Sequence, residues 1–103
     1  MKVLLVCSQG MSSAIAAKAL QEAARKKGID LAVAECSTQA FAEEIKNGYA
    51  VGMVAPQIRH RYEVLKQQAD AAGVPCILIQ PQGYMPLGGA KLLAQVEKEL
   101  GEI

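Results

Sequence analysis

One cysteine of this chain stands where a thiol can act as a nucleophile. Cys7 follows the apolar run Val3–Val6 and opens a polar loop that leads into the first helical segment. Backbone N–H groups at the start of a helix bind anions, and they lower the pKa of a nearby thiol from its ordinary value of about 8.5. Gly10 permits a tight turn, and the serines offer hydroxyl donors. The residues expected to surround the anion are Ser8, Gln9, Gly10, Met11, Ser12 and Ser13.

This loop suits two states of the same sulfur. As a thiolate, Cys7 is a nucleophile, and once it carries a phosphoryl group the same N–H groups can bind the three phosphate oxygens and stabilise their charge during transfer. The alternative is that Cys7 is a small apolar residue that ends a buried strand, as cysteine often is. We favour the nucleophile, because a strand end followed by Ser and Gly is a poor place to bury a side chain.

A second polar segment, Pro56–Arg61, follows the apolar run Ala50–Ala55. We expect Pro56 and Gln57 to form a second wall of the anion site or a surface on which a partner docks. The segment also holds a basic cluster that can attract a phosphorylated partner. This cluster consists of Arg59, His60 and Arg61. The alternatives are a rigid helix start at Pro56, a solvated cap at Gln57 and an exposed first helical turn, and His60 could instead serve Cys7 as a base.

The other cysteines and one long loop offer weaker candidates. Cys76 lies beside Ile77, Leu78 and Ile79, which predicts a buried and inert thiol, and Cys36 ends another apolar run. Three cysteines with one histidine match neither a redox pair nor a zinc site, so we expect no metal and no cofactor. The segment 80–89 is the longest irregular stretch. Its apolar residues either dock a partner or cover the core, and they are Tyr84, Met85 and Leu87.

Strands and helices alternate along the chain. The strands are expected over Lys2–Val6, Asp30–Glu35, Ala50–Ala55 and Pro75–Ile79, and their near-continuous apolar character is typical of strands covered on both faces. The helices are expected over Ser12–Lys27, Gln39–Lys46, Ile58–Ala72 and Gly89–Leu100. Lys26 and Lys27 suit the carboxyl end of the first helix, and Gly28 stops it. Ser37 and Thr38 are candidate caps for the second.

This alternation predicts an α/β fold with right-handed crossovers. We expect a doubly wound, four-stranded parallel sheet in the order 2-1-3-4, with helices on both faces. Ligands bind such sheets beyond the carboxyl ends of the strands, where the winding direction reverses. In this order the reversal lies between strands 1 and 3. The loops after Val6 and Ala55 should therefore meet there.

Composition narrows the range of functions. The 103 residues suffice for one core, and we expect a single domain over residues 1–103. A formal net charge of +1 gives no global attraction to nucleic acid or to an anionic membrane, so any anion site must be local. The amino-terminal apolar run is too short for a signal peptide, and no stretch approaches the roughly 20 apolar residues that span a bilayer. We expect a cytoplasmic protein.

The pattern of residues as a whole resembles a known family. A Val-Leu-Leu-Val-Cys strand, the loop Ser-Gln-Gly-Met-Ser-Ser and the sequence Ala-Pro-Gln-Ile after the third strand resemble the IIB components of the bacterial sugar phosphotransferase system, lactose/cellobiose type. The likeness covers nearly the whole chain and implies a flavodoxin-like fold. It also implies that Cys7 accepts phosphate from a phosphohistidine of the IIA component. Cys7 would then pass it to a cellobiose-, lactose- or chitobiose-like sugar entering through the membrane component IIC.

Two other functions are weighed against this one. Low-molecular-weight tyrosine phosphatases look similar in fold and loop, and an arsenate reductase would use the same thiolate. The phosphatase loop ends in an Arg that grips phosphate, and a distant Asp acts as general acid. Here residue 13 is Ser and the chain holds no Asp-Pro pair, which favours a carrier over a hydrolase. The third possibility is a module that only binds phosphate or a small anionic ligand.

Overall fold

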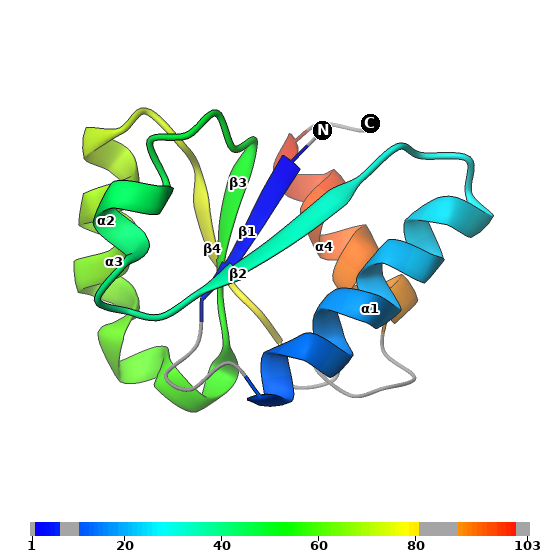
Figure 1. Ribbon diagram of the computed structural model, residues 1–103, viewed down its shortest axis with the longest axis horizontal. Coiled ribbons are helices and arrows are strands. Elements are labelled where there is room, and N and C mark those ends of the chain that lie inside the picture. Colours follow the sequence, from blue (N-terminus) through cyan, green and yellow to red (C-terminus); the bar gives the residue numbers. More distant parts are fainter. Residues whose placement is uncertain (1, 7–10, 81–88, 101–103) are drawn as a thin grey trace.

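The computed structural model describes residues 2–6, 11–80 and 89–100 (Figure 1). Two sets of predictions fall outside these ranges. They concern Cys7, Ser8, Gln9 and Gly10 of the predicted anion loop, and the apolar residues Tyr84, Met85 and Leu87 of the segment 80–89. Met11, Ser12 and Ser13 lie within the first helix, and only their backbone is described.

The elements alternate as the sequence predicts. In chain order they are β1 (Lys2–Val6), α1 (Met11–Lys26), β2 (Ala32–Cys36), α2 (Phe41–Glu44), β3 (Val51–Val54), the 3₁₀ segment η1 (Pro56–Arg61), α3 (Tyr62–Ala71), β4 (Cys76–Leu78) and α4 (Gly89–Leu100). All strand pairs are parallel, and the order is β2-β1-β3-β4, which confirms the predicted topology.

Two helical layers cover the sheet. Helices α1 and α4 pack on one face, and α2 and α3 on the other (Figure 1). Successive residues of β1 alternate between the two cores: Val3 and Leu5 join α1 and α4, while Leu4 and Val6 join α2 and α3. This is why β1 reads as an unbroken apolar run, since no side chain of Val3–Val6 is exposed.

Helix α1 buries one face against the sheet. Ala16 and Leu20 are fully buried, and Ala17 and Ala24 join them in the core. The helix ends at Lys26, and Gly28, the predicted stop, follows with a φ of 75°. The Ile29 N–H then donates to the Ala24 carbonyl at 2.8 Å, closing the last turn.

Two helices differ from their predicted extents. The second covers only Phe41–Glu44, and its N-cap is Ala40, with no side-chain cap hydrogen bond, rather than Ser37 or Thr38. A turn closed by the Ala40 N–H and the Ser37 carbonyl, at 3.2 Å, comes first. The third helix begins at Tyr62, because Pro56–Arg61 forms a 3₁₀ segment that is kinked at Ile58 (φ −116°, ψ 29°).

Two glycines allow the layers to approach closely. A Cβ atom on Gly52 of β3 would lie 3.0 Å from Cζ of Phe41, so a side chain there would press against the buried ring. A Cβ on Gly89, the first residue of α4, would collide with the backbone carbonyl of Ala19, whose carbon would lie 2.7 Å away. Helices α1 and α4 are therefore in backbone contact at that point.

Candidate functional site

The carboxyl ends of β1 and β3 lie side by side. Val6 is paired in register with Val54, and the N–H of Ala55 donates to the Val6 carbonyl at 3.0 Å. Cys7 and Pro56 are the next residues after this joined pair. The described strand ends therefore support the prediction that the two polar segments start from one point of the sheet, where its winding direction reverses.

Helix α1 begins at Met11, so only four residues separate it from the end of β1. The first turn, which includes Met11, Ser12 and Ser13, contains no acidic residue. The first N–H groups of a helix have no partner within it, and the helix dipole adds positive potential at that end. The backbone thus presents anion-binding groups beside the connection that contains Cys7.

The segment η1 forms a second element at the same edge of the sheet. Ile58 anchors it in the core at 4% exposure, and the Ile58 N–H donates to the Ala55 carbonyl at 3.1 Å. Pro56 is half-buried and Gln57 is exposed. The basic cluster is exposed throughout, and its members are Arg59, His60 and Arg61. The kink at Ile58 therefore buries one side chain and leaves three consecutive basic ones in solvent.

The two described cysteines lie in different surroundings. Cys76 is buried at 4% exposure, and burial raises the pKa of its thiol to about 11, as expected for a structural residue. Cys36 is half-buried at the carboxyl end of β2, where it is paired in register with Val6. Cys36 thus lies at the carboxyl end of the sheet, beside the strand end from which the predicted site starts.

Several features of the described residues bear on other functions. Within residues 2–6, 11–80 and 89–100 there is no group of three or more His, Cys, Asp or Glu side chains that could hold a metal ion. In the same ranges, no helix combines the length and the apolar character needed to cross a bilayer.

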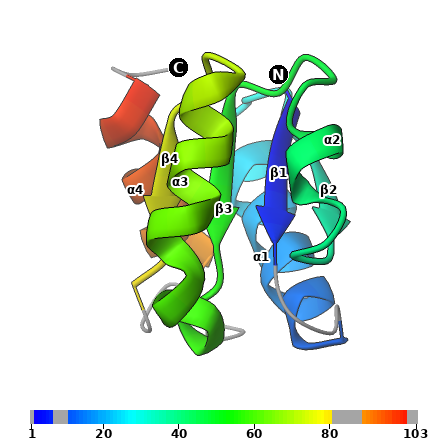
Figure 2. The ribbon, with the colours of Figure 1, turned by 90° about the vertical axis from the view of Figure 1, so that its left-hand side faces the viewer.

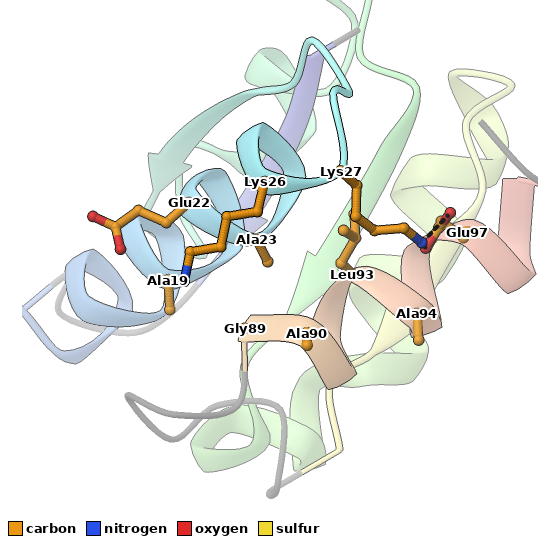
Figure 3. Close-up of a pocket in the computed structure, with 10 residues that line it drawn as sticks. All are labelled: Ala19, Glu22, Ala23, Lys26, Lys27, Gly89, Ala90, Leu93, Ala94 and Glu97. Atoms are coloured by element: carbon orange, nitrogen blue, oxygen red, sulfur yellow. Dashed lines mark hydrogen bonds and ion pairs between the residues drawn. The ribbon is translucent and has the colours of Figure 1, made fainter.

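A groove between α1 and α4 was not anticipated from the sequence. It encloses about 480 Å³, and Figure 3 shows its floor of small side chains with charged residues at the rim. The Nζ of Lys27 bridges it to Oε1 of Glu97 at 2.9 Å. The groove is lined by Ala19, Glu22, Ala23, Lys26, Lys27, Gly89, Ala90, Leu93, Ala94 and Glu97. None of these belongs to the predicted anion site.

Sequence reasoning also missed two polar side chains that bind strand backbone. Tyr62 of α3 and Gln95 of α4 both form hydrogen bonds to β4. A tyrosine and a glutamine on amphipathic helices carry no local signal for such a contact, because it depends on how the helices pack.

Comparison with known proteins shows a family whose members this chain resembles. Residues 2–95 match the family described as "PTS system, Lactose/Cellobiose specific IIB subunit". The galactose-specific EIIB component of Lactococcus lactis subsp. cremoris is 30% identical over 103 residues, covering 92% of both chains. The lactose-specific EIICB component of Streptococcus mutans is 32% identical over 99 residues, which are 94% of this chain and 17% of that relative.

Solved structures agree with the sequence relatives. The lactose-specific IIB component domain of the phosphoenolpyruvate:carbohydrate phosphotransferase system from Streptococcus pneumoniae superposes with a TM-score of 0.82, at 25% identity over 95% of each chain. The cellobiose-specific phosphotransferase IIB component of Borrelia burgdorferi superposes with a TM-score of 0.76, at 25% identity, covering 98% of this chain and 92% of that one.

Proposed function

We propose that this chain, a member of the lactose/cellobiose-specific IIB family of the sugar phosphotransferase system, carries a phosphoryl group on the thiol of Cys7. The observation that carries the proposal is the short connection from Val6 to Met11. It attaches Cys7 directly to the end of β1 and ends at the amino terminus of a 16-residue helix. A thiol near such a terminus ionises more readily, and phosphate on it meets N–H donors.

The reaction consists of two transfers that balance. In the first, the Cys7 thiolate attacks the phosphorus of a phosphohistidine on IIA, a P–S bond forms, the P–N bond breaks, and the histidine leaves with the bonding electron pair and takes up a proton from the solvent. In the second, a sugar hydroxyl attacks the same phosphorus, the P–S bond breaks and Cys7 leaves as a thiolate, while the hydroxyl proton passes to a base or to water. Neither step consumes a cofactor, and both require that phosphate oxygens be stabilised as charge shifts.

The loop and η1 have different roles in this proposal. Ser8, Gln9, Gly10, Met11, Ser12 and Ser13 surround the phosphoryl group with N–H and hydroxyl donors. Pro56 and Gln57 form the neighbouring wall, because they follow the strand end that is bonded to Val6. Arg59 and His60, exposed on the same segment, attract the phosphorylated donor.

The partners follow from the same family membership. IIA would donate phosphate, and the membrane component IIC would present the sugar; matches to relatives named EIICB support the second partner. Relatives named for lactose, galactose and cellobiose are 30–32% identical to this chain, so identity does not single out one sugar. A lactose-, cellobiose- or chitobiose-like sugar is the proposed acceptor.

Phosphate mapping tests the proposal. After incubation with phosphorylated IIA, mass spectrometry should find one phosphate on the peptide that contains Cys7, and Cys7→Ser should take up none. Cys36→Ser is the matched control, because Cys36 lies at the same edge of the sheet and the variant should be labelled like the parent. Labelling that persists in Cys7→Ser would overturn the proposal. Cys7-dependent turnover of p-nitrophenyl phosphate or arsenate would instead favour the hydrolase or reductase.

A further inference from the structure

Strand β4 ends the sheet order, so among residues 2–6, 11–80 and 89–100 no strand pairs with one of its sides. On the paired side, the Pro75 carbonyl accepts from the Gly52 N–H, and the Ile79 N–H donates to the Val54 carbonyl, each at 2.9 Å. Along a strand, the backbone groups of alternate residues point to opposite sides. Those of Cys76, Leu78 and Gln80 therefore point away from β3.

Two side chains occupy this outer side. The Tyr62 hydroxyl donates to the Cys76 carbonyl at 3.0 Å. The Gln95 Nε2 donates to the Leu78 carbonyl at 2.6 Å, and its Oε1 accepts from the Gln80 N–H at 3.3 Å. Tyr62 comes from α3 and Gln95 from α4, which flank β4 from opposite faces of the sheet (Figure 2). Three successive outward positions are thus bonded by side chains from both helical layers.

The sequence of β4 favours pairing with a strand of another molecule if the backbone groups on this side are accessible. Cys76-Ile77-Leu78-Ile79 contains no charge and no proline and is apolar throughout, and Pro75, whose carbonyl bonds to β3, comes directly before it. Short, uncharged segments rich in β-branched residues pair readily with copies of themselves, and unprotected edge strands template such pairing. In the native fold the side chains of Ile77 and Ile79 are already covered, at 8% and 1% exposure, so the backbone edge is what remains for a second strand to bind.

We propose that Tyr62 and Gln95 together close the β4 edge against addition of a strand from a second copy of this chain. The occupant would be the β4 of that copy, because an uncharged strand has no repulsion from an identical one. Charged residues usually guard an edge, and β4 has none. Here two neutral side chains occupy three of the backbone groups that an incoming strand would bind, namely the carbonyls of Cys76 and Leu78 and the N–H of Gln80.

Sedimentation equilibrium of the double variant Tyr62→Phe/Gln95→Leu tests this. We expect its weight-average mass to rise with concentration to about twice that of the parent or beyond, as two copies pair through β4 or larger assemblies form. The control Tyr49→Phe/Gln67→Leu makes the same chemical changes where no bond to β4 is involved, and should sediment like the parent. A folded double variant, verified by circular dichroism, that keeps the parent's mass at every concentration overturns the proposal.

Association caused by lower stability must be distinguished from association caused by loss of the Tyr62 and Gln95 hydrogen bonds to β4. Ala69→Gly destabilises α3 while it keeps both hydrogen-bonding side chains, since Ala69 is fully buried and glycine is a poor helix former. If Ala69→Gly associates as strongly as the double variant, partial unfolding is the cause and the proposal fails. The outcome does not depend on Cys7 chemistry, because no phosphate donor is present in either measurement.

Discussion

The N–H of Ala55 donates to the carbonyl of Val6 at 3.0 Å, and this bond joins the two strand ends from which the candidate site starts. Val6 is fully buried, and so is Ala55. The chain therefore continues towards Cys7 and towards Pro56 from two bonded strand ends. In the proposed function, the thiol of Cys7 and the basic segment η1 would serve one partner surface.

Reversing charge on η1 should slow phosphorylation by IIA. Arg59→Glu/Arg61→Glu is expected to lower the rate of phosphate uptake about tenfold at low salt, because exposed charges act mainly on association. The difference from the parent should shrink at about 1 M salt, where charges are screened within about 3 Å. Rapid-mixing kinetics with phosphorylated IIA at several salt concentrations measure the rate of phosphate uptake and its dependence on salt.

The matched control for this prediction changes the same net charge elsewhere. Lys46→Glu/Lys98→Glu alters two exposed lysines near the opposite end of the sheet. It should leave the rate within about twofold of the parent, since neither lysine belongs to η1. Equal slowing by both double variants would show that net charge, and not the position of the basic cluster, governs the encounter.

Substitution of Gly52 should destabilise the α2 side of the sheet. In Gly52→Ala the new methyl group meets Phe41 Cζ at 3.0 Å and Ile45 Cδ1 at 3.2 Å, and both side chains are fully buried. We expect a loss of about 1–3 kcal/mol in the free energy of unfolding, measured in urea. In the background Phe41→Leu the same substitution should cost less, because the ring that it strikes is gone. Equal costs in both backgrounds would contradict the contact.

Gly89 should tolerate no side chain at all. A methyl group there strikes the backbone of Ala19, which cannot turn aside as a flexible side chain can, so we expect Gly89→Ala to cost at least about 2 kcal/mol. Helix propensity alone would predict a gain, since alanine is the better helix former. Ala90→Ser, at the exposed next position, should change the free energy of unfolding by less than about 0.5 kcal/mol. Thermal and urea unfolding distinguish the two.

The thiol of Cys76 should stay unreactive until the solution is strongly alkaline. Burial raises its pKa from 9.0 to about 11, so its thiolate is scarce at neutral pH and alkylation of the native protein should be slow. Because the pKa in the folded protein is above that of the unfolded chain, the stability linked to this thiol is full below pH 9.0 and is lost as the pH rises towards about 11.

Comparison with Cys76→Ala isolates this thiol. Burial also raises the pKa of Tyr62, so the parent loses stability from both groups in alkaline solution. The variant should lose stability less steeply with pH above 9.0, measured by urea unfolding at each pH. Identical slopes in the parent and in Cys76→Ala would show that the thiol does not titrate differently on folding.

Much of the fold can be predicted from local patterns. Runs such as Val3–Val6 are apolar on both sides because both faces of the sheet are covered, and alternation with helices then restricts the topology. The missed boundaries have physical causes. Pro56 favours a helix start, and the kink that buries Ile58 yields a 3₁₀ segment where periodicity predicts a continuous helix. At Ala40, packing of Phe41 against Gly52 outweighs the absence of a side-chain cap.

The site is predicted less completely than the fold. The positions of Val6, Met11 and Pro56 follow from the strand order, so the end of the sheet at which the proposed chemistry would take place could be inferred from sequence. The contacts of Tyr62 and Gln95 with β4 could not, because they join residues 14 to 17 positions apart through the packing of two helices. How the donors of the Cys7 loop are arranged around phosphate stays a prediction.

The parallel sheet also places the start of β1 and the end of α4 opposite to the end at which the proposed site lies. Lys2 begins β1 and Leu100 ends α4, both at the edge opposite to Val6 and η1 (Figure 1). A tether joined at either of these residues would leave the molecule on the side away from Val6 and η1. Such a tether can raise the effective concentration of the acceptor protein many-fold without covering the reactive edge. The same architecture can therefore serve as a freely diffusing shuttle or as an arm of a larger assembly.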